Sequence, residues 1–132
     1  MENKVIVDSY ILIDLLRNDI KTVSLVKEME NLNILGTTDI NAFELYHGAY
    51  KSRNVEKNLA SVKGLLNTLF LVSTSEDSME VAGKLLAEMD RKGTAISVKD
   101  ALIAAMCLIG SYSLLTRNKK DFVNIAGLKL ID

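Results

Sequence analysis

Short apolar runs alternate with amphipathic stretches along the whole chain. Successive apolar, often β-branched residues predict buried strands, and such runs occupy residues 5–7, 34–36, 69–72, 114–116 and 128–130. Apolar residues spaced three and four apart predict helices, and these occupy residues 11–16, 22–30, 40–51, 56–68, 75–91, 101–109 and 119–123. Short strands that alternate with helices predict an α/β three-layer sandwich, in which helices flank a short parallel sheet of about five strands.

Capping residues support several of these boundaries. Residues 37–39 (TTD) are N-cap candidates for the helix that follows them. Gly93, preceded by two basic residues, is a typical helix stop, and Ser97 and Asp100 have the spacing of a capping box. The sequence contains no proline and no Ser/Gly-rich linker, so residues 1–132 are predicted to form a single domain.

Composition narrows the classes of function. The 132 residues are 48% hydrophobic and 25% charged, as in a globular protein, and their net charge of −1 indicates no general attraction to nucleic acid or membranes. One cysteine excludes an internal disulfide or a CxxC metal site, and one histidine excludes HExxH-type sites. The chain has no long apolar run and a polar start, so we expect a cytoplasmic protein without a membrane partner. Its chemistry is expected to rest on carboxylates.

Acidic and amide side chains follow the predicted strands and open the next helices. In a parallel α/β sheet, ligands bind beyond the carboxyl ends of the strands. Four predicted strand-to-helix junctions carry side chains of this kind: Asp8, Asp39 with Glu44, Asp100, and Asn118 with Asp121. The sequence therefore predicts a group of carboxylates at one edge of the sheet.

Each of these acids also has a purely structural interpretation. Asp8 could cap the helix that follows it, and Asp100 could both cap its helix and complement the helix dipole. Glu44 and Asp121 could be solvated surface charges. Spacing favours a site at Glu44, because Gly48 lies one turn later on the same face and leaves open space beside the carboxylate.

A group of converging carboxylates indicates a cation. Three or four acids at one edge repel one another unless a positive charge lies between them. Ligand sets made only of oxygen suit Mg²⁺ or Mn²⁺. Such a metal activates water and polarises phosphoryl oxygens, so the predicted reaction class is phosphodiester hydrolysis or another phosphoryl transfer.

Four segments, in this order and spacing, resemble the PIN domain, and specifically the VapC-type toxins of prokaryotic toxin–antitoxin pairs. They are VIVDSYILID at 5–14, FELYHGA at 43–49, ISVKDALIAA at 96–105 and LTRNKKDF at 115–122, the last leading to Gly127 and Leu128. The resemblance covers nearly the whole chain.

The resemblance implies a metal-dependent ribonuclease with a compact parallel sheet. By position, Asp8, Glu44 and Asp100 would be the metal ligands, with Asn118 or Asp121 as the fourth residue of the site and Asp121 among the catalytic acids. Residues that would support these acids or contact the substrate are Ser9, Thr116, Arg117 and Asn118. The resemblance also implies an RNA substrate, a homodimer, and an antitoxin partner that inserts a peptide near the site. Apolar helix faces over residues 23–29 and 59–66 favour the same homodimer.

One departure from the family pattern bears on activity. Family members usually have Ser or Asn two residues after the first Asp, where this chain has Tyr10, with a hydroxyl at Ser9 instead. A catalytically silent module that binds RNA or protein therefore stays an alternative. An aspartyl-phosphate phosphatase is disfavoured because it needs a second Asp at position 10, and a phosphoreceiver is disfavoured because it needs adjacent acids before Asp8.

The remaining chemically capable residues are expected to be structural. Asp14 and Asp39 are predicted to be helix-start or surface acids, His47 a surface or packing residue, and Cys107 a buried, inert thiol. Tyr46 and Tyr50 are predicted core or dimer contacts, with base stacking as the alternative. Five basic residues flank the acidic loops, where they either contact phosphates or are solvated: Lys51, Arg53, Arg117, Lys119 and Lys120.

Overall fold

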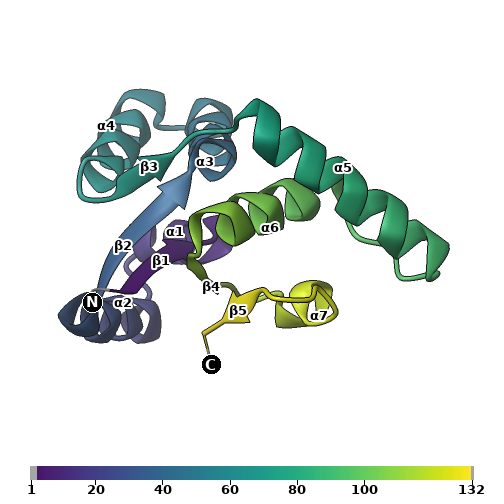
Figure 1. Cartoon of the computed structure of the whole chain (residues 1–132). Coiled ribbons are helices and arrows are strands. Elements are labelled where there is room, and N and C mark those ends of the chain that lie inside the picture. Colours follow the sequence, from purple (N-terminus) through teal and green to yellow (C-terminus); the bar gives the residue numbers. More distant parts are fainter. Residues whose placement is uncertain (1–2, 132) are drawn as a thin grey trace.

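The computed structural model describes residues 3–131 and consists of five strands and seven helices (Figure 1). In chain order these are β1 (Asn3–Val7), α1 (Ser9–Leu16), α2 (Ile20–Leu32), β2 (Asn33–Thr38), α3 (Asp39–Lys51), α4 (Val55–Leu66), β3 (Phe70–Val72), α5 (Glu76–Arg91), α6 (Val98–Gly110), β4 (Ser113–Leu115), α7 (Lys119–Phe122) and β5 (Lys129–Leu130). The order of elements predicted from the sequence is confirmed, with boundaries that differ by a few residues.

The five strands form one parallel sheet in the order β3-β2-β1-β4-β5. The central strand β1 pairs with both neighbours: Val5 is in register with Leu35 of β2, and Val7 with Leu115 of β4. Side chains of a strand alternate between the two faces. Val5 and Val7 accordingly belong to one core cluster, and Ile6 belongs to another.

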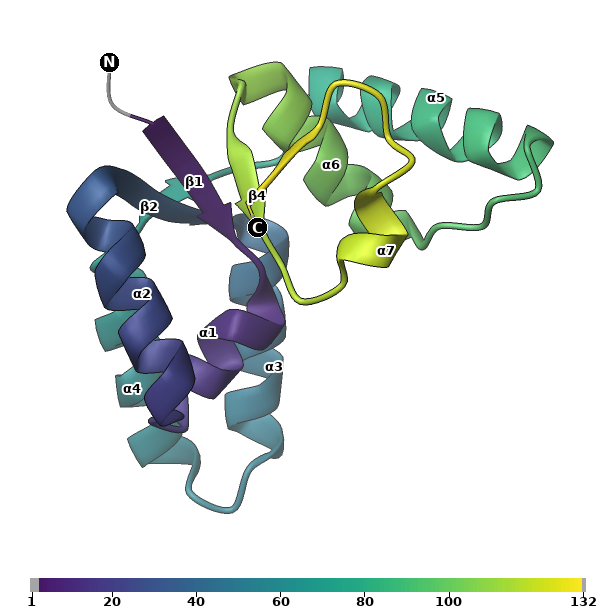
Figure 2. The same cartoon turned by 90° about the horizontal axis from the view of Figure 1, so that it is seen from below.

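Helices cover both faces of the sheet (Figures 1 and 2). Helices α1 to α4 contribute to the cluster around Val5 and Val7, and α5, α6 and α7 contribute to the cluster around Ile6. Since β1 is covered on both sides, its apolar residues are almost fully buried, which explains why this strand is a continuous apolar run in the sequence. The predicted α/β three-layer sandwich is confirmed.

The element that precedes Asp100 differs from the prediction. Strand β3 leads into α5, and α6 follows α5 through residues 92–97, so Asp100 lies at a helix-to-helix junction and not after a strand. Helices α5 and α6 pack against each other, and this pairing returns the start of α6 to the sheet. The expectation of four strand-to-helix junctions with acids was therefore wrong for one of the four.

The apolar faces expected to drive dimerisation are turned inward. Val26 of α2 and Val62 of α4 are buried, and most other large apolar residues of these faces pack against the same core cluster, namely Leu25, Met29, Leu59, Leu65 and Leu66. Large exposed apolar side chains occur elsewhere in the described residues, among them Ile20, Leu32, Phe43 and Tyr50.

Among residues 3–131, no helix is long and apolar enough to cross a membrane.

Candidate active site

Asp8 is the most deeply buried acid of the site. It follows β1 directly, and its side chain is 1% exposed. Oδ1 accepts a hydrogen bond from the Ser9 N–H at 2.9 Å, and Oδ2 accepts one from the Thr116 hydroxyl at 2.8 Å. The N–H of Asp8 donates to the carbonyl of Leu115 at 2.9 Å. Asp8 therefore caps α1, as its structural interpretation predicted, and is also held rigidly between the ends of β1 and β4.

The end of β1 is held from the other side by α3. The Val7 carbonyl accepts hydrogen bonds from the Thr37 hydroxyl at 2.8 Å and from Asn41 Nδ2 at 3.3 Å. Thr38 caps α3 by accepting from the N–H of Asn41 at 3.1 Å. Strand β2 reaches Thr38 by pairing with β3. The buried contacts of Thr37, Thr38 and Asn41 fix the start of α3, and therefore Glu44, relative to Asp8.

Lys99 connects Asp8 and Glu44. Its Nζ lies 2.7 Å from Glu44 Oε1 and 4.0 Å from Asp8 Oδ1. It also donates to the Ser9 hydroxyl at 3.1 Å and lies 5.6 Å from the centre of the Tyr10 ring. The Lys99 and Glu44 side chains are partly buried, at 27% and 35% exposed, so this ion pair is screened less than one on the open surface. Two of the three predicted metal ligands, Asp8 and Glu44, therefore face the same ammonium.

Asp100 and Asp121 extend the negative charge beyond Asp8. Burial is the main cause that raises the pKa of Asp100, and repulsion from Asp8 and Asp121 raises it further, against the lowering effects of Ser97 and Lys99. Only the Ser97 half of the predicted capping box forms among these described residues: the Ser97 hydroxyl accepts from the Asp100 N–H at 3.1 Å. The carboxylate of Asp100 therefore serves less as a cap than the sequence indicated.

The other residues predicted beside the acids divide into two groups. Thr116 hydrogen-bonds Asp8, and its hydroxyl accepts from the Asn118 N–H at 3.1 Å, so the backbone of Asn118 lies next to Thr116. Arg117 points elsewhere: its Nε lies 3.0 Å from Asp14 Oδ2, and its Nη2 donates to the Thr22 hydroxyl at 2.6 Å. Arg117 therefore ties the loop after β4 to α1 and α2, and its contact with a substrate stays a prediction.

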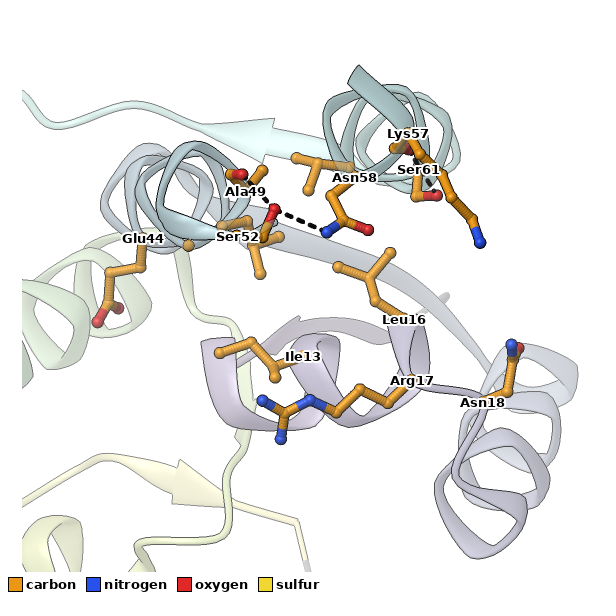
Figure 3. A pocket seen from close by; sticks show the side chains of 13 residues that line it. Ile13, Leu16, Arg17, Asn18, Glu44, Ala49, Ser52, Lys57, Asn58 and Ser61 are labelled. Carbon is orange, nitrogen blue, oxygen red and sulfur yellow. Dashed lines mark hydrogen bonds between the residues drawn. The ribbon is translucent and has the colours of Figure 1, made fainter. Parts of the chain in front are cut away.

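A groove of about 440 Å³ opens between α1, α3 and α4, and Glu44 lies at one end of it (Figure 3). In Figure 3 the Glu44 side chain lies apart from the others, on the side where α6 passes. A Cβ atom on Gly48 would meet no heavy atom within 4 Å. The open space predicted beside Glu44 is therefore present, and it continues into the groove.

Comparison with known proteins shows the family. A family model described as PIN domain matches residues 5–128. The chain belongs to the PIN-domain family. This PIN domain is similar to the "tRNA(fMet)-specific endonuclease VapC" of Salmonella typhimurium, at 31% identity over 109 residues that cover 81% of this chain and 83% of the relative. It is also similar to "Ribonuclease VapC2" of Rickettsia felis, at 31% identity over 98 residues that cover 74% of this chain and 73% of the relative.

A solved structure has the same fold over the full length. This is the crystal structure of DNA-bound VapBC from Salmonella typhimurium, which matches with a TM-score of 0.87 at 26% identity. The match covers 100% of this chain and 98% of that one. The resemblance stated from the sequence, and the PIN-like fold that it implied, are confirmed.

The donor chemistry of this PIN domain fits a hard divalent cation. Asp8, Glu44 and Asp100 offer only carboxylate oxygens, which are the ligands that Mg²⁺ and Mn²⁺ prefer. Within residues 3–131, however, no three acidic, His or Cys side chains are grouped closely enough to hold one ion as they stand. The positive charge that faces Asp8 and Glu44 in this structure is the ammonium of Lys99.

Lys99 is the residue of the site that the sequence reasoning missed. It lies between Ser97 and Asp100, the two residues that have capping-box spacing. One signal was present in the sequence: a lysine in the first turn of a helix opposes the helix dipole, which favours acids there. A cation in that position, directly before a candidate metal ligand, indicates a nearby negative charge that outweighs the dipole.

The residues expected to be structural lie away from the acids or in the core. His47 is exposed and stacks on Phe43, with ring centroids 6.0 Å apart. Cys107 is 1% exposed, and burial, with a smaller contribution from Asp8, raises the pKa of its thiol to about 12. Asp39 accepts hydrogen bonds from the N–H and hydroxyl of Thr74 and so ties α3 to the loop after β3.

Proposed function

We propose that this PIN domain is a metal-dependent endoribonuclease that hydrolyses RNA phosphodiester bonds and acts as the toxin of a toxin–antitoxin pair. The observation that carries the proposal is the buried carboxylate of Asp8, oriented at the carboxyl edge of the sheet by hydrogen bonds from Ser9 and Thr116. Glu44 shares the Lys99 ammonium with it, and Asp100 is close enough for repulsion from Asp8 to raise its pKa. The family and the ribonuclease names of the relatives support the same class of reaction.

In this proposal Asp8, Glu44 and Asp100 hold Mg²⁺ or Mn²⁺. When bound, such an ion activates water and polarises a phosphoryl oxygen. Thr116 and the Ser9 N–H keep the carboxylate of Asp8 in one orientation, so that little reorganisation is needed when the site is used. Asp121 is exposed on α7 and close enough to Asp100 to raise its pKa, so its carboxylate is available to accept a proton at the open side of the site.

An antitoxin protein is the proposed partner. The groove between α1, α3 and α4 has both apolar and polar walls and reaches Glu44. A peptide seated in it would lie beside the Glu44 carboxylate and would block it. The groove therefore offers a physical route by which one partner could control access of RNA to the site.

Cleavage that depends on a divalent metal is the first expected result. Purified protein is incubated with a panel of structured RNAs in Mg²⁺, Mn²⁺ or EDTA, and the products are separated on denaturing gels. We expect internal cuts with either metal and none in EDTA, because the proposed ligands are all carboxylates. Cleavage that survives EDTA would contradict the metal mechanism. Failure to cut any RNA with metal present would favour the silent interaction module.

A homodimer is the second expected result. Ile20 and Leu32, at the two ends of α2, are 82% and 77% exposed, and Phe43 and Tyr50 on α3 are 66% and 65% exposed. Side chains of this size are commonly covered by an isologous contact with a second copy. Light scattering at tens of micromolar should return twice the 14.6 kDa mass of one chain. A mass near that of a single chain would contradict the dimer.

A further inference from the structure

Lys99 has an unusual set of partners for a lysine near the surface. Its ammonium contacts Glu44 of α3, lies near Asp8 at the end of β1, and donates to the Ser9 hydroxyl. The Tyr10 ring lies 5.6 Å from the same nitrogen, within the range of a cation–π interaction. One side chain of α6 thus contacts α3, the end of β1 and the start of α1, and it joins the two candidate metal ligands Asp8 and Glu44.

Without these partners, the position of Lys99 would be unfavourable for a positive charge. It lies in the first turn of α6, where the helix dipole repels positive charge. Burial is the largest single influence on the pKa of Lys99 and lowers it. The contact with Glu44 and the attraction of Asp8, Glu44 and Asp100 outweigh burial, and the pKa is raised above its ordinary value. The carboxylates therefore hold this charge in place.

We propose that Lys99 is a built-in counter-ion that competes with the divalent metal for Glu44 and Asp8. In the metal-free protein its ammonium neutralises these carboxylates, and it must leave Glu44 before a metal can bind there. This inference rests on the proposed function, because it takes Glu44 and Asp8 as metal ligands. Metal affinity is accordingly lower than the number of carboxylates alone would give.

Tyr10 has a role when a metal replaces the Lys99 ammonium at Glu44. An ammonium released from Glu44 keeps two partners on α1, the Ser9 hydroxyl and the face of the Tyr10 ring. Lys99 therefore does not have to enter solvent completely when the metal binds. The departure from the family pattern at position 10 and the lysine at position 99 form one local arrangement in this chain.

The test compares Mn²⁺ binding and metal-free stability in three proteins. Lys99→Met keeps an unbranched side chain and removes the charge; Lys21→Met removes an exposed lysine from the equivalent second position of α2. By calorimetric titration, Lys99→Met should bind Mn²⁺ at least about tenfold more tightly than the wild type, since a competing positive charge is gone. In EDTA its melting temperature should fall, because Asp8 and Glu44 lose their counter-ion. Lys21→Met should change neither property.

Further variants separate the loss of the Lys99 charge from other effects of the substitution. Lys99→Gln retains a polar side chain that can hydrogen-bond Glu44, and it too should bind Mn²⁺ more tightly. In the Glu44→Gln background, Lys99→Met should lower the metal-free melting temperature less than it does in the wild type. Wild-type Mn²⁺ affinity in both Lys99 variants would overturn the inference and leave the proposed function standing. Absence of Mn²⁺ binding to the wild type and to both variants would overturn the two together.

Discussion

Replacement of Asp8 by Asn is expected to abolish RNA cleavage while the protein stays folded. Asn has nearly the same shape as Asp and is also a good N-cap, so its Oδ1 can still accept from the Ser9 N–H. The Thr116 hydroxyl can rotate and accept from the new amide. What is lost is the negative charge in the centre of the site. Loss of a metal ligand removes several kcal/mol of transition-state stabilisation, so kcat/KM should fall by about a thousandfold or more.

Cleavage of a fluorogenic RNA in Mg²⁺ measures this loss, with circular dichroism as the check on folding. Asp90→Asn is the matched control, because Asp90 is an exposed acid near the end of α5 and the substitution changes the net charge by the same amount. The control should keep wild-type activity. A folded Asp8→Asn protein with activity close to that of the control would show that Asp8 is only a helix cap.

Replacement of Asp100 by Ala is expected to abolish cleavage without destabilising the metal-free protein. Because folding raises the pKa of this carboxyl, its ionised form is less favourable in the folded chain than in the unfolded chain at neutral pH. Removal of the charge should therefore leave the melting temperature in EDTA unchanged or raised. The increase in melting temperature that Mg²⁺ gives the wild type should disappear in the variant, since one ligand is missing.

A capping role for Asp100 predicts the opposite sign. In that case the substitution should cost about 0.5–1 kcal/mol with or without metal, and cleavage should persist. Asp77→Ala is the matched control, because Asp77 is an exposed acid in the first turn of α5. It should show this capping pattern, with a small loss of stability in both conditions and normal cleavage. A lower melting temperature of Asp100→Ala in EDTA, together with retained activity, would refute a role in the site.

The strands and helices were predictable because the hydrophobic pattern reflects burial directly. Strands covered on both faces are continuous apolar runs, as Val5 to Val7 illustrate, and helices covered on one face have apolar residues at helical spacing. Boundaries were less predictable where long-range hydrogen bonds decide them. Thr37 and Thr38 continue β2 because they pair with Leu71 and Val72 of β3, which are far away in the sequence, and no local pattern contains that pairing.

The position of Asp8 was predictable, but the surroundings of the candidate site were not. A carboxylate that follows a parallel strand lies at the carboxyl edge of the sheet by topology alone, which is why Asp8 could be selected. Arg117 illustrates the limit, because it follows β4 on the same edge but turns to Asp14 and Thr22. The direction of a long side chain depends on partners from other elements.

The sequence by itself determined the three-layer architecture, the edge of the sheet at which Asp8 lies, and the family. These depend on local periodicity and on the order of the elements, which a linear pattern contains. Only the tertiary structure decided which charges face each other. The α5–α6 pair returns the start of α6 to the sheet and brings Lys99 between Glu44 and Asp8. Electrostatic interactions act through space over a few ångströms, and residues 8, 44 and 99 come that close only when the chain is folded.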